Sequence, residues 1–199
     1  QLRYALQNIS TSVDRASHLV NQLLTLARAE ASEVSAQVME PVELDRLLSE
    51  IVGEWVMVAR ERLIDIGFES SARAVISGNV FLLREMINNL LDNALRYTPE
   101  SGRVTARSLG EHGQVVLEIE DSGIGISIDD ARKVFDRFYR VEGTGVEGSG
   151  LGLAIVREIA QLHRAEASLA PHASDESGNR QQGAVARVVF PAYAPSNEP

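Results

Sequence analysis

Residues 84–97, REMINNLLDNALRY, are the stretch that decides the fold. On an α-helix, at about 100° per residue, four polar residues fall within one arc of about 80°: Glu85, Asn89, Asn93 and Arg96. Apolar residues fill the opposite side, so the stretch predicts a largely buried helix with one polar stripe. Amide oxygens beside an arginine suit Mg²⁺, which keeps several waters and bridges to phosphates, and the guanidinium suits an anionic oxygen. A helix with a solvated polar face is the alternative for this stretch alone.

A second motif, Asp121-Ser-Gly-Ile-Gly125, follows the apolar run 115–119. The apolar run predicts a strand, so the motif falls where a strand ends. A carboxylate there can accept a hydrogen bond from an exocyclic amine, and the glycines let a flat ring approach the backbone closely. A plain glycine turn is the alternative interpretation of this motif alone.

A third motif is rich in glycine, since five of the chain's 15 glycines lie within residues 143–152. Three of them match the dinucleotide fingerprint G-x-G-x-x-G, but that fingerprint needs a hydrophobic strand before it. The preceding residues 135–140, FDRFYR, are no such strand. We interpret the stretch as a glycine loop that leads into a helix N-terminus near residues 149–151. Free backbone N–H groups and the helix dipole there favour phosphate binding.

Outward from these motifs, hydrophobic periodicity predicts helices and short strands in mixed order. Helices are expected at 43–63, at 81–97, near 128–135 and from the glycine loop to about residue 163. Strands are expected at 64–68, 74–76, 104–109, 115–119, 167–169 and 184–190. Adjacent hairpins among helices predict an α+β fold in which helices and a sheet form a two-layer sandwich. Pro41 and the small polar residues before it predict a linker over 36–41, and we expect a frayed tail at 194–199.

The first 35 residues carry a different pattern. Apolar residues recur there in alternating steps of four and three, as in a heptad seam, at Leu2, Leu6, Ile9, Val13, Ala16, Val20, Leu23 and Ala27. One such helix cannot bury its own apolar stripe, so we expect it to need a partner chain or a neighbouring helix. Because Gln1 already lies inside this pattern, we expect the chain to be a piece of a longer protein.

Composition excludes several classes of protein. The 199 residues carry 19 Lys and Arg against 28 Asp and Glu, and the net charge of −9 argues against a nucleic-acid-binding protein. The absence of cysteine excludes disulfides, thiolate catalysis, zinc fingers and iron–sulfur clusters. No apolar run reaches the roughly 18 residues that a membrane span needs. None of the four histidines has a metal-binding spacing such as H-E-x-x-H.

Four motifs, in this order, resemble the boxes of one family. They are residues 89–97 (N box), 121–125 (first glycine box), 135–139 (F box) and 148–153 (second glycine box). The chain thus resembles the catalytic ATP-binding domain of two-component sensor histidine kinases, within the gyrase/Hsp90/histidine-kinase/MutL superfamily. The resemblance implies a Bergerat-type ATP-binding fold over residues 42–193. Residues 1–35 resemble part of the family's dimerisation and phosphotransfer hairpin, namely its second helix.

The resemblance also implies the cofactors ATP and Mg²⁺. On the phosphate side, Asn89 and Asn93 would face the metal and the phosphates. Arg96 would occupy the family's basic phosphate-contacting position, and Tyr97 would pack beside the nucleotide.

On the base side, the resemblance implies that Asp121 bonds the adenine amine, with Gly123 and Gly125 framing the base. Arg140 is a candidate contact to the γ-phosphate at the edge of a lid, and the two phenylalanines of the F box are expected to anchor that lid in the core. The lid hinge and the triphosphate cradle would be formed by Gly148, Gly150, Leu151 and Gly152.

One departure from the family concerns the phosphoacceptor. The family's acceptor histidine sits in a box of the form His-Glu-(Leu/Val)-(Arg/Lys)-(Thr/Ser)-Pro, and this chain contains no such box. His18 is followed by Leu-Val-Asn-Gln, without the acidic neighbour or the proline. We therefore expect no catalytic residue in this chain and place the acceptor histidine upstream of Gln1.

These features predict the ATP-binding kinase domain of a protein-histidine kinase. It would transfer the γ-phosphate of ATP to a histidine outside the chain, and the phosphate would pass on to a response-regulator aspartate. One alternative is a nucleotide-gated interaction module or pseudokinase. Another is a superfamily ATPase, but such hydrolases place a general-base glutamate one turn before the magnesium asparagine, where this chain has Asn89.

The resemblance implies partners and a location as well. A response-regulator receiver domain is the expected partner, and a homodimer is expected in the full-length protein, with no nucleic acid bound. The domain is expected in the cytoplasm, and upstream segments would tie it to the bacterial inner membrane.

Overall fold

The computed structural model describes residues 39–71, 73–111, 113–141, 145, 148–172 and 183–191. The heptad segment with His18, the first half of the expected 36–41 linker and the expected tail lie outside these residues.

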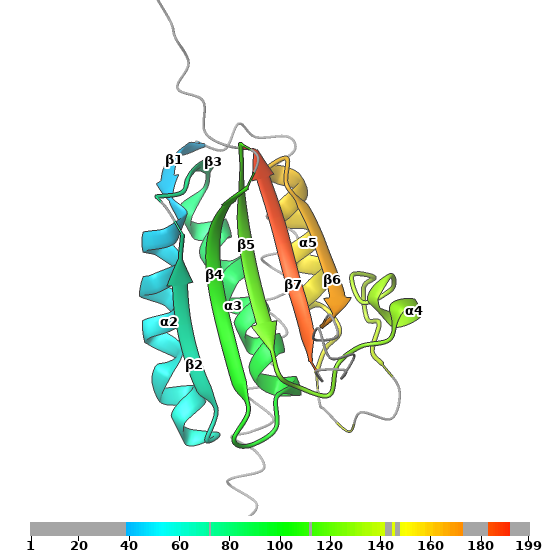
Figure 1. The fold of residues 1–199 in the computed structure, drawn as a ribbon. Coiled ribbons are helices and arrows are strands. Elements are labelled where there is room, and N and C mark those ends of the chain that lie inside the picture. The colour runs from blue at the N-terminus through cyan, green and yellow to red at the C-terminus, as the bar shows by residue number, and fades with distance from the viewer. Residues whose placement is uncertain are drawn as a thin grey trace, which may run out of the picture.

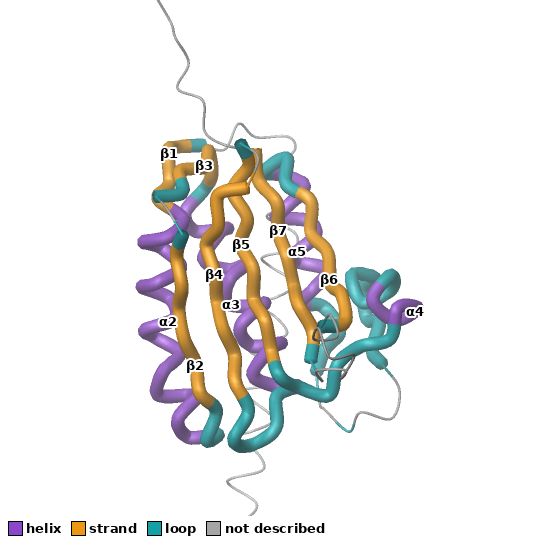
Figure 2. The backbone as a smooth tube through the Cα atoms, in the orientation of Figure 1, coloured by secondary structure: helices purple, strands orange, loops and turns teal. Residues whose placement is uncertain are grey.

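A five-stranded mixed sheet forms one layer of the molecule (Figures 1 and 2). The strand order is β2-β4-β5-β7-β6, in which β2 and β4 run parallel and the other neighbours run antiparallel. The strands are β2 (Asp65–Ser70), β4 (Arg103–Glu111), β5 (Gln114–Asp121), β6 (Glu166–Pro171) and β7 (Ala184–Pro191).

Three helices cover one face of this sheet and form the second layer: α2 (Leu44–Glu61), α3 (Val80–Tyr97) and α5 (Gly152–Leu162). The short helix α4 (Ile128–Ala131) lies beside the β6 edge (Figure 1) and ends earlier than the expected 128–135. The α+β two-layer prediction is confirmed. None of the helices in the described ranges is long and apolar enough to cross a lipid bilayer.

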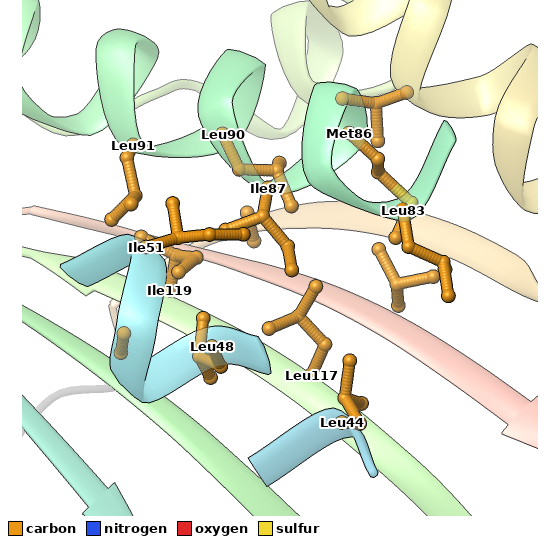
Figure 3. Packing of buried hydrophobic residues seen from close by; sticks show 14 of the residues in the cluster. Leu44, Leu48, Ile51, Leu83, Met86, Ile87, Leu90, Leu91, Leu117 and Ile119 are labelled. Carbon is orange, nitrogen blue, oxygen red and sulfur yellow. The ribbon is translucent and has the colours of Figure 1, made fainter. Parts of the chain in front are cut away.

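The core lies between the sheet and the helices. Along β5, side chains alternate between the two faces, so Leu117 and Ile119 point toward the helices and Glu118 and Glu120 point away. Figure 3 shows Leu117 and Ile119 against leucine and isoleucine side chains of α2 and α3. Asp121 has the same parity as Leu117 and Ile119, so β5 delivers this carboxylate to the helix side of the sheet.

Two hydrogen bonds fix α3 between its neighbours. The Trp55 indole of α2 donates to Asn88 Oδ1 of α3 at 2.9 Å. At the start of α3, the Asn79 N–H donates to Nε2 of His163, the residue after α5, at 3.0 Å. Because Nε2 accepts, the His163 proton lies on Nδ1, which donates to the Ile159 carbonyl at 2.7 Å. The polar stripe of α3 is therefore held at a set angle to the sheet.

The expected linker over 36–41 is wrong for its last two residues. Glu40 and Pro41 belong to β1 (Glu40–Glu43), which pairs with β3 (Val75–Gly78) in a separate two-stranded sheet. Proline is tolerated there because a two-stranded sheet consists of edge strands. The domain therefore begins before Val42.

Candidate functional site

The end of β5, the start of β7 and the C-terminus of α3 meet at one end of the sheet (Figure 1). Asp121 ends β5 there and is only 6% exposed. Its Oδ1 accepts hydrogen bonds from the backbone N–H groups of Gly123 (2.8 Å) and Ala184 (3.3 Å). Its Oδ2 accepts none from the described residues. One carboxylate oxygen is thus fixed and the other can receive a donor from a ligand.

The pKa of Asp121 reflects this burial. Desolvation raises it to about 6, against the opposing effect of the two backbone hydrogen bonds. The charge of Glu120 raises it further, and His172 lowers it. At neutral pH the buried carboxylate is therefore mostly ionised. Oδ2 is not sealed from solvent as a buried atom without a partner would be, so the geometry leaves it open to a ligand that brings an N–H group.

The two glycines after Asp121 pack the motif onto its neighbours. A Cβ on Gly123 would lie 2.3 Å from the Tyr97 carbonyl oxygen, and Ile124 donates to that same oxygen at 3.3 Å. Gly125 has φ +75°, and its Cβ would lie 3.2 Å from the Gly183 carbonyl oxygen. Glycine is required at both positions because a side chain would clash with another backbone segment. The contact of Gly123 with Tyr97 joins the first glycine box to the N box.

On α3, all four residues of the predicted stripe, Glu85, Asn89, Asn93 and Arg96, are half-buried, as is Tyr97 at the end of the helix. The Asn89 side-chain amide donates to the Glu85 carbonyl at 2.8 Å, so its own helix orients it. Arg96 Nε donates to Asp92 Oδ2 at 2.6 Å, an i,i+4 pair. Asp92 thus orients the Arg96 guanidinium, which is expected to contact a phosphate. The sequence pattern gave no sign of this role.

The start of α5 is built on the F box. Gly150 has φ +72°, its carbonyl accepts from the Phe138 N–H at 2.9 Å, and a Cβ on it would lie 2.7 Å from the Phe138 carbonyl carbon. Leu151, at the N-cap, is buried and has no side-chain acceptor for the first N–H groups of the helix. Gly148, on the loop before the helix, is exposed. The N–H groups at Gly152 therefore begin a helix without a side-chain cap, an arrangement suited to anions.

The F-box phenylalanines differ from each other. Phe135 is buried, as expected, but Phe138 is 67% exposed, so the prediction that both anchor the core is wrong. Phe138 has φ +64°, and this left-handed backbone, held by the Gly150 carbonyl, turns the side chain outward. Arg140, two residues on, is exposed at the edge of the glycine loop.

Comparison with known families agrees with this geometry. Residues 78–194, more than half of the chain, match the family model described as histidine kinase-, DNA gyrase B- and HSP90-like ATPase. The chain belongs to this family. Within it, the chain is the ATP-binding domain of a sensor histidine kinase, which confirms the predicted family.

Two relatives are sensor proteins of bacteria. The chain is 36% identical over 159 residues to the sensor protein kinase PmrB of Pseudomonas aeruginosa, a match that covers 79% of this chain and 33% of PmrB. It is 37% identical over 186 residues to the sensor protein QseC of Salmonella typhi, a match that covers 93% of this chain and 38% of QseC. The chain thus spans 33% to 38% of the length of these relatives.

Two solved structures of histidine kinases share the fold. Full-length ShkA in complex with AMPPNP superimposes with a TM-score of 0.78 at 26% identity, over 96% of this chain and 39% of that one. ThkA in complex with the response regulator TrrA superimposes with a TM-score of 0.72 at 21% identity, over 100% of this chain and 53% of that one.

The described side chains of this domain would bind a metal only if phosphate supplied further ligands. No group of three or more His, Asp or Glu side chains in the described ranges could hold a metal by itself. The oxygen donors expected to face the metal are the amides of Asn89 and Asn93, and the stripe also carries the Glu85 carboxylate one turn before Asn89. Neutral amide oxygens fit Mg²⁺ when phosphate and water supply the remaining ligands.

Sequence analysis missed the residues that complete the carboxylate site. Gly183 contacts the backbone of Asp121 so closely that a Cβ there would lie 1.9 Å from the Asp121 carbonyl oxygen. Ala184 then supplies the second N–H to Oδ1. The only signal in the sequence was a glycine just before the last predicted strand.

Proposed function

We propose that this domain binds ATP with Mg²⁺ and donates the γ-phosphoryl group to a histidine outside the chain, from which an aspartate of a response-regulator receiver domain receives it. The observation that carries the proposal is the buried Asp121, whose Oδ2 lacks a described partner beside the polar stripe of α3. The family match supports it, as do PmrB and QseC, which are both named sensor proteins.

At the base end, the adenine amine would donate to Asp121 Oδ2. The fixed Oδ1 prevents the carboxylate from rotating, because two backbone N–H groups hold it. Gly123 and Gly125 keep the motif flat against Tyr97 and Gly183, which leaves this side of the base without side chains. Tyr97 ends α3 next to this motif and would line the nucleotide.

At the phosphate end, Asn89 and Asn93 would hold Mg²⁺, which neutralises phosphate charge when bound. Arg96, steadied by Asp92, would take a phosphate oxygen. The N–H groups at the start of α5, from Gly150 and Leu151 to Gly152, would cradle the triphosphate, with Gly148 as the hinge of a lid. The Leu151 N–H donates to Ser149 Oγ at 3.2 Å, so it would exchange this acceptor for a phosphate oxygen. Arg140 at the loop edge would reach the γ-phosphate.

The transfer step requires that the acceptor nitrogen and the γ-phosphate be aligned. A nitrogen of the acceptor imidazole attacks the γ-phosphorus, the bond to the bridging oxygen breaks, and ADP leaves. This chain's residues would bind and align ATP, which is the main source of catalysis in phosphoryl transfer. Asn89 cannot accept a proton from water, so the site favours transfer over hydrolysis.

In the full-length protein we place this domain on the cytoplasmic side of the bacterial inner membrane, as one subunit of a homodimer. PmrB and QseC are longer sensor proteins, of which this chain covers 33% and 38%. Their names support this placement.

The binding site is tested with variants on α3 and at the end of β5. Asn93→Ala and Asp121→Asn should each weaken Mg-ATP binding by about 1–3 kcal/mol, because each removes one polar contact. Asn88→Ala is the matched control, since it removes the Trp55 hydrogen bond and should lower stability but leave affinity unchanged. Calorimetric titration measures affinity, and thermal unfolding measures stability. Unchanged affinity in both site variants would refute the assignment.

The transfer is tested by reconstitution. The chain is incubated with radiolabelled ATP and a separately made hairpin that carries a histidine box of the family. Acid-labile label should appear on the hairpin and should be lost with Asn93→Ala. Binding of ATP without any label would favour an interaction module, and label on this chain that is lost in His18→Ala would show that the acceptor lies within it.

A further inference from the structure

His172 lies at the end of β6, outside the residues assigned to the nucleotide. Its Nε2 is 2.7 Å from Glu120 Oε1. The other oxygen of Glu120 accepts from Arg107 of β4. Glu120 is the residue before Asp121 and points to the opposite face of the sheet. His172 and Arg107 therefore both hold β5 at the residue just before Asp121.

The backbone of His172 contacts the other support of Asp121. Its N–H donates to the Gly183 carbonyl at 3.0 Å. Gly183 packs directly on the Asp121 backbone, and the next residue, Ala184, donates to Asp121 Oδ1 at 3.3 Å. His172 therefore touches both segments that hold this carboxylate: Glu120 on β5, and Gly183 at the start of β7.

We propose that His172 is a positioning residue for Asp121 and that the His172–Glu120 pair sets the pH range over which Asp121 accepts the adenine amine. This inference rests on the proposed function, because it concerns the same base-binding carboxylate.

The charges around the pair define the expected direction. Arg107 also contacts Glu69 of β2 and Glu118 of β5, and Arg187 of β7 contacts Glu118 and Glu111. Arginine side chains stay charged throughout the accessible pH range. Burial works against ionisation of Glu120, but hydrogen bonds from Arg107 and His172 outweigh it and lower the pKa of Glu120 below its usual value. Among the residue types of this cluster, histidine is the one whose ordinary titration range lies between pH 5 and 8.

The two members of the pair act on Asp121 in opposite directions. Negative Glu120 raises the pKa of Asp121, and His172 lowers it. Loss of the imidazole should move the protonation of Asp121 to higher pH, and loss of the Glu120 charge should move it to lower pH. If these residues acted on folding alone, their loss would not shift the protonation of Asp121 in opposite directions.

The test is calorimetric titration of Mg-ADP between pH 5 and 8 with three proteins: the unsubstituted chain, His172→Gln and Glu120→Gln. Affinity should fall in acid as Asp121 is protonated. The midpoint of that fall should rise by about half a pH unit in His172→Gln, which is about threefold in affinity near pH 6, and should drop by a similar amount in Glu120→Gln. Titration of the ADP phosphates is common to all three proteins and cancels in the comparison.

His172→Lys is the rescue variant, since it keeps a positive charge beside Glu120 and should return the midpoint to the unsubstituted value or below. Equal loss of affinity at all pH values in both variants, with no shift of the midpoint, would overturn the inference but leave the proposed function intact. Carbon NMR of the Asp121 carboxyl in the unsubstituted chain gives a second measurement that needs no variant to fold. A single inflection there, without a component from His172, would also overturn the inference. Absence of Mg-ADP binding by the unsubstituted chain would refute the proposed function and this inference with it.

Discussion

At the scale of single residues, Asp121 illustrates a conflict between binding and stability. Its folded pKa of about 6 lies above the value of about 3.9 in an unfolded chain. The stability that this group contributes is therefore fully present below about pH 3.9 and is lost as pH rises through 6. At neutral pH the native state must keep a charge buried, and a nucleotide that supplies an N–H group offsets that penalty.

We predict that Asp121→Asn stabilises the empty domain at pH 8 by about 1–3 kcal/mol. An asparagine can accept the same two backbone N–H groups without a buried charge. Thermal unfolding at pH 8 and pH 4.5 checks this, because the gain should shrink in acid, where the aspartate is already neutral. A variant that is less stable than the unsubstituted chain at pH 8 would contradict the prediction.

At the scale of elements, the contact between α3 and α5 depends on a neutral histidine. His163 is buried, and burial lowers its pKa below the usual value near 6.5. Its Nε2 must stay unprotonated to accept from Asn79. The stability that His163 contributes is fully present above about pH 6.5 and is lost as pH falls through that value toward the lower folded pKa.

We predict that His163→Gln flattens the loss of stability between pH 7.5 and pH 5.5. Glutamine can accept from Asn79 and donate to Ile159 without titrating. Denaturant unfolding at several pH values measures the slope, and Val56→Ala, at an exposed position of α2, is the control. An unchanged slope in His163→Gln would mean that the α3–α5 contact tolerates the charged ring.

The elements themselves were largely predictable from local pattern. The periods of 3.6 and 2 placed α3 and β5 to within two residues, because their apolar faces are continuous. The strand β1 was missed because its sequence, EPVE, has no strand pattern and because its partner β3 lies far along the chain, with Glu40 paired to Gly78 and Glu43 to Val75. The fold class followed from the order of elements alone.

The site was predictable only in part. The residue types at Asn89, Asn93 and Asp121 pointed to nucleotide chemistry before any contact was known. The hydrogen bond from Ala184 to Asp121 joins residues 63 positions apart, and that from His172 to Glu120 joins residues 52 apart. Sequence spacing carries no information on such contacts. The outward turn of Phe138 was equally invisible, since it depends on its backbone contact with Gly150.

At the scale of the whole molecule, the helices and the sheet share one core. Ile87 of α3 is fully buried in that core, among residues of α2 and β5 (Figure 3). Val56 of α2 is 45% exposed. The domain should therefore unfold as one cooperative unit, since no described helix has a core of its own.

We predict that Ile87→Ala lowers the free energy of unfolding by about 2–5 kcal/mol, because it leaves a cavity in the core. Val56→Ala should change it by less than about 0.5 kcal/mol. Urea unfolding followed by the fluorescence of Trp55, the only tryptophan of the chain, measures both. A small effect of Ile87→Ala, or two separate transitions, would show that the helical layer and the sheet unfold independently.

The N–H group of Ala184 on Asp121 Oδ1 has a consequence for synthesis of the protein. A nascent chain that has emerged from the ribosome only as far as β6 already contains Asp121, the polar stripe of α3 and the start of α5. It lacks β7, the strand whose first residue fixes the carboxylate. Cellular ATP therefore cannot act as a template for the early stages of folding, and the nucleotide site matures only after nearly the whole domain has been translated.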